Sequence, residues 1–113
     1  MNIRELSAED LAPLLSLYTH LHAQDDPLPP LPEVRTVWAE ALANPRIRYF
    51  GGWDEGALVS SCTLTVIPNL TRACRPYGVI ESVVTHSSQR DQGWGHALLQ
   101  HALAHAWREH CYK

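Results

Sequence analysis

Residues 80–99 of the chain read IESVVTHSSQRDQGWGHALL, and this stretch decides the fold. Branched residues such as Val83 and Val84 favour a strand in its first part, and apolar residues at helical spacing follow its end. Two glycines, Gly93 and Gly95, stand at the junction. Backbone N–H groups converge where a strand turns into a helix, and the helix dipole favours negative charge there. The stretch therefore predicts a strand–turn–helix unit suited to holding a phosphate.

Two common nucleotide-binding motifs do not fit this stretch. The dinucleotide fingerprint needs a third glycine at the position of Leu98, and the P-loop needs a lysine, although none precedes Lys113. A pair of glycines can also serve helix geometry alone. The remaining pattern is Arg-x-x-Gly-x-Gly, which runs from Arg90 to Gly95.

This pattern, following a strand, resembles the acetyl-coenzyme A (acetyl-CoA) signature of the GNAT family of N-acetyltransferases, and residues 80–86 resemble that family's fourth strand. The resemblance implies an α/β (α+β) fold with a mixed, mostly antiparallel sheet flanked by helices. It also implies an enzyme that transfers the acetyl group of acetyl-CoA to a primary amine, by direct attack in a ternary complex. Acetyl-CoA would be the cosubstrate, and no metal would be needed.

The resemblance assigns roles to residues of this stretch. Backbone groups at Val83, Val84 and Thr85 would pair with the pantetheine arm, and one N–H would polarise the thioester carbonyl. The coenzyme pyrophosphate would be held by the turn and the helix start, at Arg90, Asp91, Gln92, Gly93, Trp94, Gly95 and Ala97. Glu81 is the candidate general base, because the attacking amine must be neutral. A solvent-exposed or substrate-orienting role for Glu81 stays open.

The acceptor is less defined, and both a small-molecule amine and a protein amine fit. His20 and His22 precede Asp25 and Asp26 in a region that helps to form the acceptor pocket in this family. A role in acceptor binding is therefore a hypothesis, beside a purely structural one.

The rest of the chain predicts the order strand, helix, helix, strand, strand, strand, helix. The expected strands are residues 2–6, 47–53, 57–67 and 78–85, and the expected helices are residues 8–22, 33–43 and 93–110. Ser7 is the expected N-cap of the first helix, with Glu9 and Asp10 in its first turn. Four prolines between Asp25 and Pro32 predict a loop.

Composition limits the class of protein. The chain has 113 residues, of which 45% are hydrophobic, and this is the size of one domain. Its apolar runs are far shorter than the roughly 20 residues that cross a membrane. With an N-terminus unlike a secretory signal, this predicts a cytoplasmic protein without membrane partners. The net charge is -3 and no dense basic stripe occurs, so nucleic acid is not an expected partner. Three widely spaced cysteines predict buried or half-buried thiols without a disulfide.

The resemblance covers residues 1–113 as a single N-acetyltransferase domain that is C-terminally truncated relative to the family and lacks its last strands and helix. The tyrosine that protonates the leaving thiolate in the family has no counterpart, since Tyr112 precedes that point. An unpaired edge on the fourth strand would favour a homo-oligomer. The alternative function is a non-catalytic module that binds coenzyme A (CoA) or a protein partner.

Overall fold

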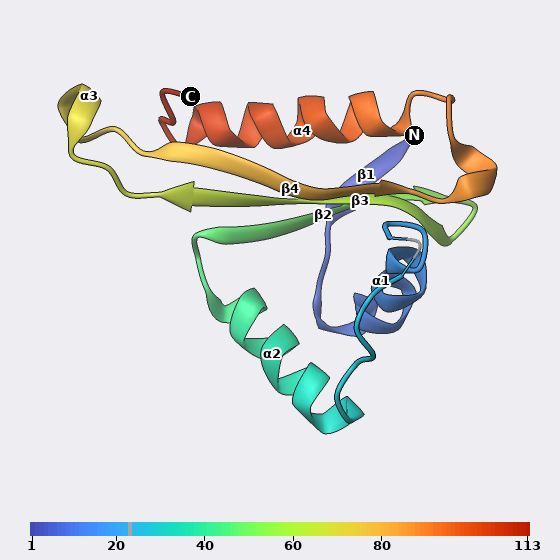
Figure 1. Ribbon diagram of the computed structural model, residues 1–113. Helices are drawn as coiled ribbons and strands as arrows, with labels where there is room; N and C mark the ends of the chain where they lie inside the picture. The colour runs from blue at the N-terminus through green and yellow to red at the C-terminus, as the bar shows by residue number, and fades with distance from the viewer. Residues whose placement is uncertain (23) are drawn as a thin grey trace.

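The computed structural model describes residues 1–22 and 24–113. Its sheet has four strands in the order β1-β2-β3-β4, and every pairing between them is antiparallel. The strands are β1 (Asn2–Glu5), β2 (Ile47–Asp54), β3 (Ala57–Ile67) and β4 (Tyr77–Thr85). Figure 1 shows α4 (Trp94–Arg108) along one face of the sheet, and α1 (Leu11–Tyr18) and α2 (Leu31–Ala43) on the other. The predicted sheet flanked by helices is confirmed, with strand boundaries within one residue of those expected.

The first helix is shorter than predicted. A 3₁₀ turn, η1 (Ala8–Asp10), precedes α1, and α1 ends at Tyr18 rather than at residue 22. The N–H and Oγ of Ser7 donate to Asp10 Oδ2 at 2.8 and 3.2 Å, which confirms the predicted start. At the other end, the N–H groups of residues 19–21 reach back three residues instead of four. The carbonyl of His20 accepts a hydrogen bond from Arg90 at 3.1 Å, which ties the segment after α1 to the loop before α4.

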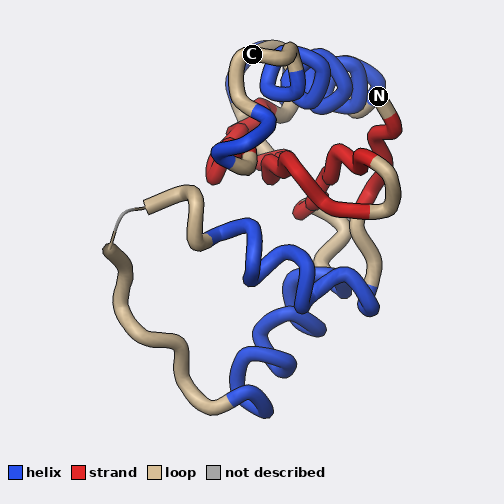
Figure 2. Tube along the Cα trace, turned by 90° about the vertical axis from the view of Figure 1, so that its right-hand side faces the viewer, coloured by secondary structure: helices blue, strands red, loops and turns tan. Residues whose placement is uncertain are grey.

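The two connections rich in proline or polar residues also differ in detail from the prediction. The long loop before α2 is seen in Figure 2, and α2 begins at Leu31 because Pro32 is tolerated in a first helical turn. Between β3 and β4 lies the short turn α3 (Thr71–Cys74), where residues 72–74 have φ values of 55 to 61°. No pattern in the sequence indicated this left-handed turn.

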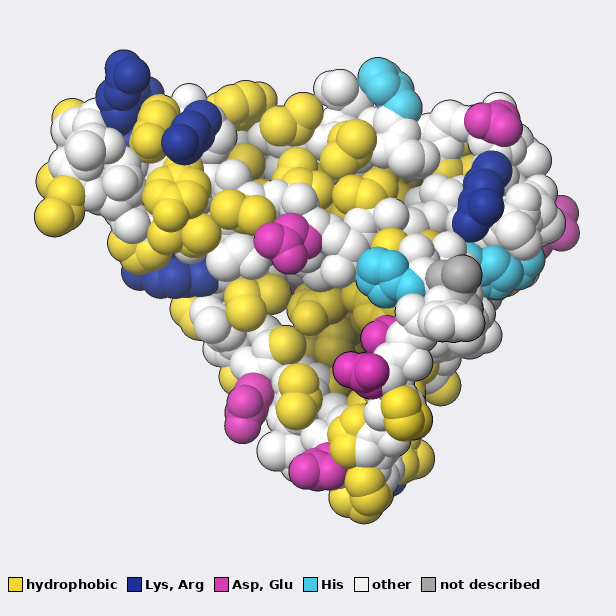
Figure 3. Space-filling model, viewed as in Figure 1, with side chains coloured by type: hydrophobic (Ala, Val, Ile, Leu, Met, Phe, Trp, Pro, Cys, Tyr) yellow, Lys and Arg dark blue, Asp and Glu magenta, His cyan; other side chains and the backbone are white. Residues whose placement is uncertain are grey.

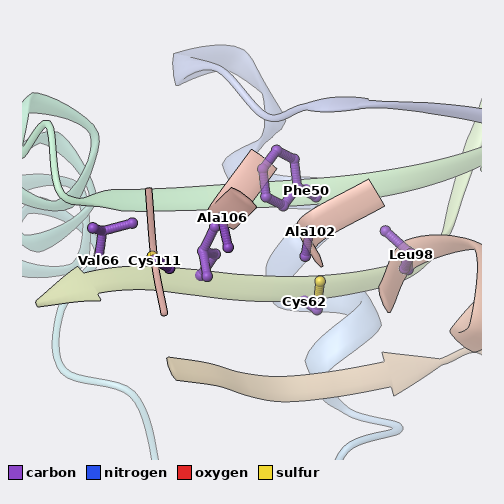
Figure 4. Close-up of a cluster of buried hydrophobic side chains, with 8 residues drawn as sticks. Phe50, Cys62, Val66, Leu98, Ala102, Ala106 and Cys111 are labelled. Carbon is purple, nitrogen blue, oxygen red and sulfur yellow. The ribbon is translucent and has the colours of Figure 1, made fainter. Parts of the chain in front are cut away.

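Hydrophobic side chains fill both faces of the sheet. Under α4 the buried cluster consists of Phe50, Cys62, Leu64, Val66, Leu98, Ala102, Ala106 and Cys111 (Figure 4). On the opposite face it consists of Leu6, Leu14, Leu17, Trp38, Leu58 and Val84. Cys62 and Cys111 are buried free thiols, as expected, whereas Cys74 is exposed. Among the described residues, no helix is long and apolar enough to cross a membrane.

Two adjacent glycines in β2 let neighbouring side chains pack closely against both faces of the sheet. A Cβ on Gly51 would lie 2.5 Å from Leu6 and 2.6 Å from Leu58. A Cβ on Gly52 would lie 2.7 Å from the ring of Trp94, the first residue of α4. Trp94 is buried, so its ring anchors the start of α4 on the glycine backbone. This contact fixes the turn between β4 and α4 on the sheet.

Candidate functional site

A pocket of about 550 Å³ opens where β4 ends and α4 begins. The residues that line it are His20, Leu21, Val83, Val84, Thr85, Gln89, Arg90, Asp91, Gly93, Trp94, Gly95 and His96. The structure thus brings most of the site residues predicted from the sequence together around one pocket. Three of them, Glu81, Gln92 and Ala97, lie outside its lining.

The start of α4 presents backbone donors to this pocket. Gly93 is the N-cap residue and has a φ of 90°, a left-handed conformation that favours glycine. The amides of Trp94, Gly95 and His96 belong to the first turn of α4, where N–H groups have no acceptor within the helix. They are therefore available to an anion. The amide of Ala97 instead donates to the Gly93 carbonyl at 3.0 Å. A Cβ on Gly95 would have no atom within 4 Å, so open space adjoins the backbone there.

Arg90 connects three parts of the pocket. Its Nε donates to the carbonyl of Thr85 at 3.3 Å, and its Nη2 donates to the carbonyl of His20 at 3.1 Å. The guanidinium therefore ties the end of β4 to the segment after α1. It also places a positive charge in the lining of the pocket to which the start of α4 belongs, in a chain whose net charge is -3.

A β-bulge lies in β4 next to the pocket. The register passes from Ser61 opposite Val84 to Thr63 opposite Glu81, so Ser82 and Val83 together face one residue of β3. Ser82 has a φ of 50°. A bulge of this kind leaves backbone groups outside the ladder, in the segment predicted to pair with a pantetheine arm.

The β3 residue opposite this bulge is Cys62, which is fully buried. Burial raises the pKa of the Cys62 thiol to about 11. The thiol therefore stays protonated at neutral pH and does not act as a nucleophile.

His20, which lines the pocket, packs against the ring of His86. The ring centroids of His20 and His86 are 4.0 Å apart. The N–H of Ser87 donates to His20 Nδ1 at 3.4 Å, and the N–H of Ser88 donates to His86 Nδ1 at 3.1 Å. Burial lowers the pKa of His20, and the nearby His86 and Arg90 lower it further. The lowered pKa favours the neutral form of His20. Because Nδ1 accepts the hydrogen bond from Ser87, the neutral ring carries its hydrogen on Nε2. His86 was not identified from the sequence.

Glu81 lies on the sheet face covered by α1 and α2. Thr63 pairs with Tyr49 of β2 on one side and with Glu81 of β4 on the other, so these three residues form one row across the sheet. Residues directly opposite one another project to the same face. Tyr49 packs against the buried cluster beneath α1 and α2, so the whole row, including Glu81, projects to the face of the sheet that these helices cover. The Glu81 side chain is exposed and comes directly before the bulge.

Two neighbouring cavities lie on this same side of the sheet. The first, which we call the apolar cavity, has a volume of about 210 Å³ and lies between α1, α2 and Tyr49. The second, the acidic-rimmed cavity, has about 320 Å³ and includes His22, Asp25 and Asp26. Both include Leu15, Tyr18 and Leu28 in their linings. Figure 3 shows the hollow below the sheet, with hydrophobic side chains in its depth and acidic ones at its rim.

Titratable side chains elsewhere do not form a metal centre in the part of the chain that the structure describes, where no three His, Cys, Asp or Glu side chains are grouped to hold an ion.

Comparison with known proteins relates the chain to acetyltransferases. Residues 11–113 match the model of the acetyltransferase (GNAT) family. A glucosamine 6-phosphate N-acetyltransferase from Trypanosoma brucei brucei is 30% identical over 113 residues, which are 100% of this chain and 76% of that protein. A solved structure from Agrobacterium tumefaciens strain C58, described as an acetyltransferase, is 39% identical with a TM-score of 0.93, over 100% of this chain and 78% of that chain. A predicted acetyltransferase from Clostridium acetobutylicum, solved with acetyl-CoA, shares the fold at 17% identity and a TM-score of 0.81, over 99% of this chain and 77% of that chain.

Proposed function

Because this chain belongs to the acetyltransferase (GNAT) family and is thereby an enzyme of the acyltransferase class, we propose that it transfers the acetyl group of acetyl-CoA to the primary amine of a small molecule. The observation that carries this proposal is the single pocket shared by the bulge of β4 and the free amides of α4. A small-molecule acceptor is supported by the curated relative, which is named for an amino sugar phosphate.

The residues of the pocket fit a pyrophosphate group at its helical end. The amides of Trp94, Gly95 and His96 would donate to phosphate oxygens, and the positive end of α4 would favour their charge. Gly95 leaves the space through which an anion can approach these amides. Arg90 would add a positive charge while holding the end of β4 in place. At this end of the pocket the chain would therefore bind the pyrophosphate and orient the coenzyme.

The backbone at the bulge of β4 is suited to hold the pantetheine arm of acetyl-CoA. Acetyl-CoA supplies an activated acyl group as a thioester, and the chain has to position that group against an amine. Backbone groups of Val83, Val84 and Thr85 would hold the arm as an added strand does. A backbone N–H there would also stabilise negative charge that develops on the acetyl oxygen.

The amine would approach from the face of α1 and α2. Glu81 projects to that face immediately before the bulge, and a carboxylate there can accept the proton of an ammonium group, directly or through water. Removing that proton exposes the lone pair that attacks the acetyl carbon. We therefore assign Glu81 as the general base.

Thiol release from acetyl-CoA in the presence of a panel of primary amines, including glucosamine 6-phosphate, tests the proposal. We expect release that depends on one amine of the panel, and a Glu81→Gln variant that binds CoA normally but needs a higher pH for the same rate. An unchanged rate and pH profile would refute the base assignment. Binding of CoA without turnover on any amine would instead favour a non-catalytic module.

A further inference from the structure

The hollow between α1 and α2 points to the chemical class of the acceptor. We propose that the acceptor is a small primary amine with an apolar body, such as a short arylalkylamine, whose body fills the apolar cavity and whose ammonium group extends toward Glu81. The acidic rim would attract this cation to the hollow. This inference rests on the function proposed above and concerns the amine alone.

The apolar cavity has the size and walls for such a body. Its volume of about 210 Å³ is that of about seven water molecules at liquid density, enough for a phenyl ring with a short alkyl chain. The rings of Tyr18, Trp38 and Tyr49 form part of its walls. Trp38 and Tyr49 pack edge to face, with ring centroids 4.9 Å apart. Burial raises the pKa values of Tyr18 and Tyr49, so both phenols stay neutral.

The charges around the hollow favour a cation over an anion. Asp25 and Asp26 lie on the acidic-rimmed cavity, and no lysine or arginine is among the described residues that line either cavity. Up to Thr71 the chain carries nine acidic residues and four basic ones. A field of this sign attracts an ammonium group and repels a phosphate. The hollow therefore differs in charge from a site for an amino sugar phosphate.

The position of the hollow also suits the chemistry of transfer. Tyr49, on the wall of the apolar cavity, lies in the same cross-strand row as Glu81. Two strand spacings, about 10 Å, separate their backbones. An amine with its body against Tyr49 would extend across Thr63 toward Glu81 and the bulge.

Val37 offers a sharp test because it lines the apolar cavity and yet is 63% exposed, so a lysine there can be solvated. Thr36 is also exposed, lies on the same helix and lines neither cavity, so Thr36→Lys is a control with the same added charge. The probes are 2-phenylethylamine, the uncharged 2-phenylethanol and glucosamine 6-phosphate. Their binding is measured by calorimetry on the full chain, together with CoA binding and acetyl transfer.

We expect 2-phenylethylamine to bind at least about tenfold more tightly than glucosamine 6-phosphate. Val37→Lys should weaken 2-phenylethylamine about tenfold through repulsion of like charges, and 2-phenylethanol less than about threefold. Thr36→Lys should change neither affinity, and CoA binding should be unaffected in both variants. An Asp25→Asn, Asp26→Asn double variant should weaken the amine but not the alcohol, more strongly at low salt.

The outcomes separate the two proposals. Acetyl transfer to glucosamine 6-phosphate, with no binding of 2-phenylethylamine, would overturn this inference and leave the proposed function intact. Equal effects of Val37→Lys and Thr36→Lys on 2-phenylethylamine would also overturn it. Binding of 2-phenylethylamine that responds to Val37→Lys, with no acetyl transfer to any amine, would overturn the proposed function.

Discussion

Replacing Gly95 by alanine should make the protein more stable and its coenzyme binding weaker. Gly95 is the second residue of α4 and lines the pocket at the bulge of β4. A Cβ at this position meets no atom of the protein within 4 Å, so the substitution adds no steric strain. The new methyl group would instead occupy the space beside the free amides of the first helical turn.

The two effects have opposite signs and measurable sizes. Alanine is favoured over glycine in a helix by roughly 0.5–1 kcal/mol, which corresponds to a rise in Tm of a few degrees for a domain of this size. Displacing a phosphate from one charged hydrogen bond costs about 1.5–3 kcal/mol. The Kd for CoA should therefore rise between about 10-fold and 150-fold.

Thermal unfolding without ligand and calorimetry with CoA measure the two effects separately. S-acetylpantetheine, which lacks the pyrophosphate, should bind Gly95→Ala and the unaltered protein equally. Gln100→Ala, at an exposed position farther along α4, is the control and should leave CoA affinity unchanged. An unaltered affinity of Gly95→Ala for CoA would show that the phosphate does not lie on these amides.

Three further substitutions test other features of the structure. Gly93→Ala and Gly56→Ala both force alanine into a left-handed conformation, at φ values of 90 and 82°, and each should cost roughly 1–2 kcal/mol in urea unfolding. Only Gly93→Ala should also weaken CoA binding, and equal CoA affinities would argue against the site. Arg4 donates to Asp10 at 2.8 and 3.1 Å, and these bonds hold the pKa of the Asp10 carboxyl below its ordinary value. Asp10→Ala should therefore lose roughly 1–3 kcal/mol of unfolding free energy at neutral pH, and this difference should shrink as the pH falls below about 4; a pH-independent difference would contradict the ion pair.

The fold could be predicted from the sequence where local patterns and tertiary packing agree. Branched residues such as Val59, Thr65 and Ile67 define β3, which is an inner strand of the sheet, and its predicted ends coincide with those observed. The end of α1 was predicted four residues too late, because Leu21 continues the helical spacing whereas the hydrogen bonds from Thr19 onward already reach back only three residues. The hydrogen bond from Arg90 to the carbonyl of His20, 70 residues apart, lies in this segment, and local periodicity does not disclose it.

In the candidate site, too, local sequence patterns predict some features, and contacts between distant segments determine the others. The pattern from Arg90 to Gly95 predicts a turn at a helix start, and this turn does line the pocket. The bulge at Ser82 is set by the register against β3, which no spacing within β4 discloses. His86 packs against His20 of the pocket lining, a contact between residues far apart in the sequence. Contacts between distant segments thus determine the bulge and the contact between His20 and His86, neither of which the motif predicts.

The contact between Gly52 and Trp94 has a consequence for how this sequence can change over evolution. Any larger side chain at Gly52 would push against the Trp94 ring and lift the start of α4, which carries the amides of the pocket. Selection for the proposed coenzyme binding would therefore act on a residue of β2 that lies outside the lining of the pocket. Drift at Gly52 is expected to be tolerated only when Trp94 becomes smaller, so that the two positions change as a pair.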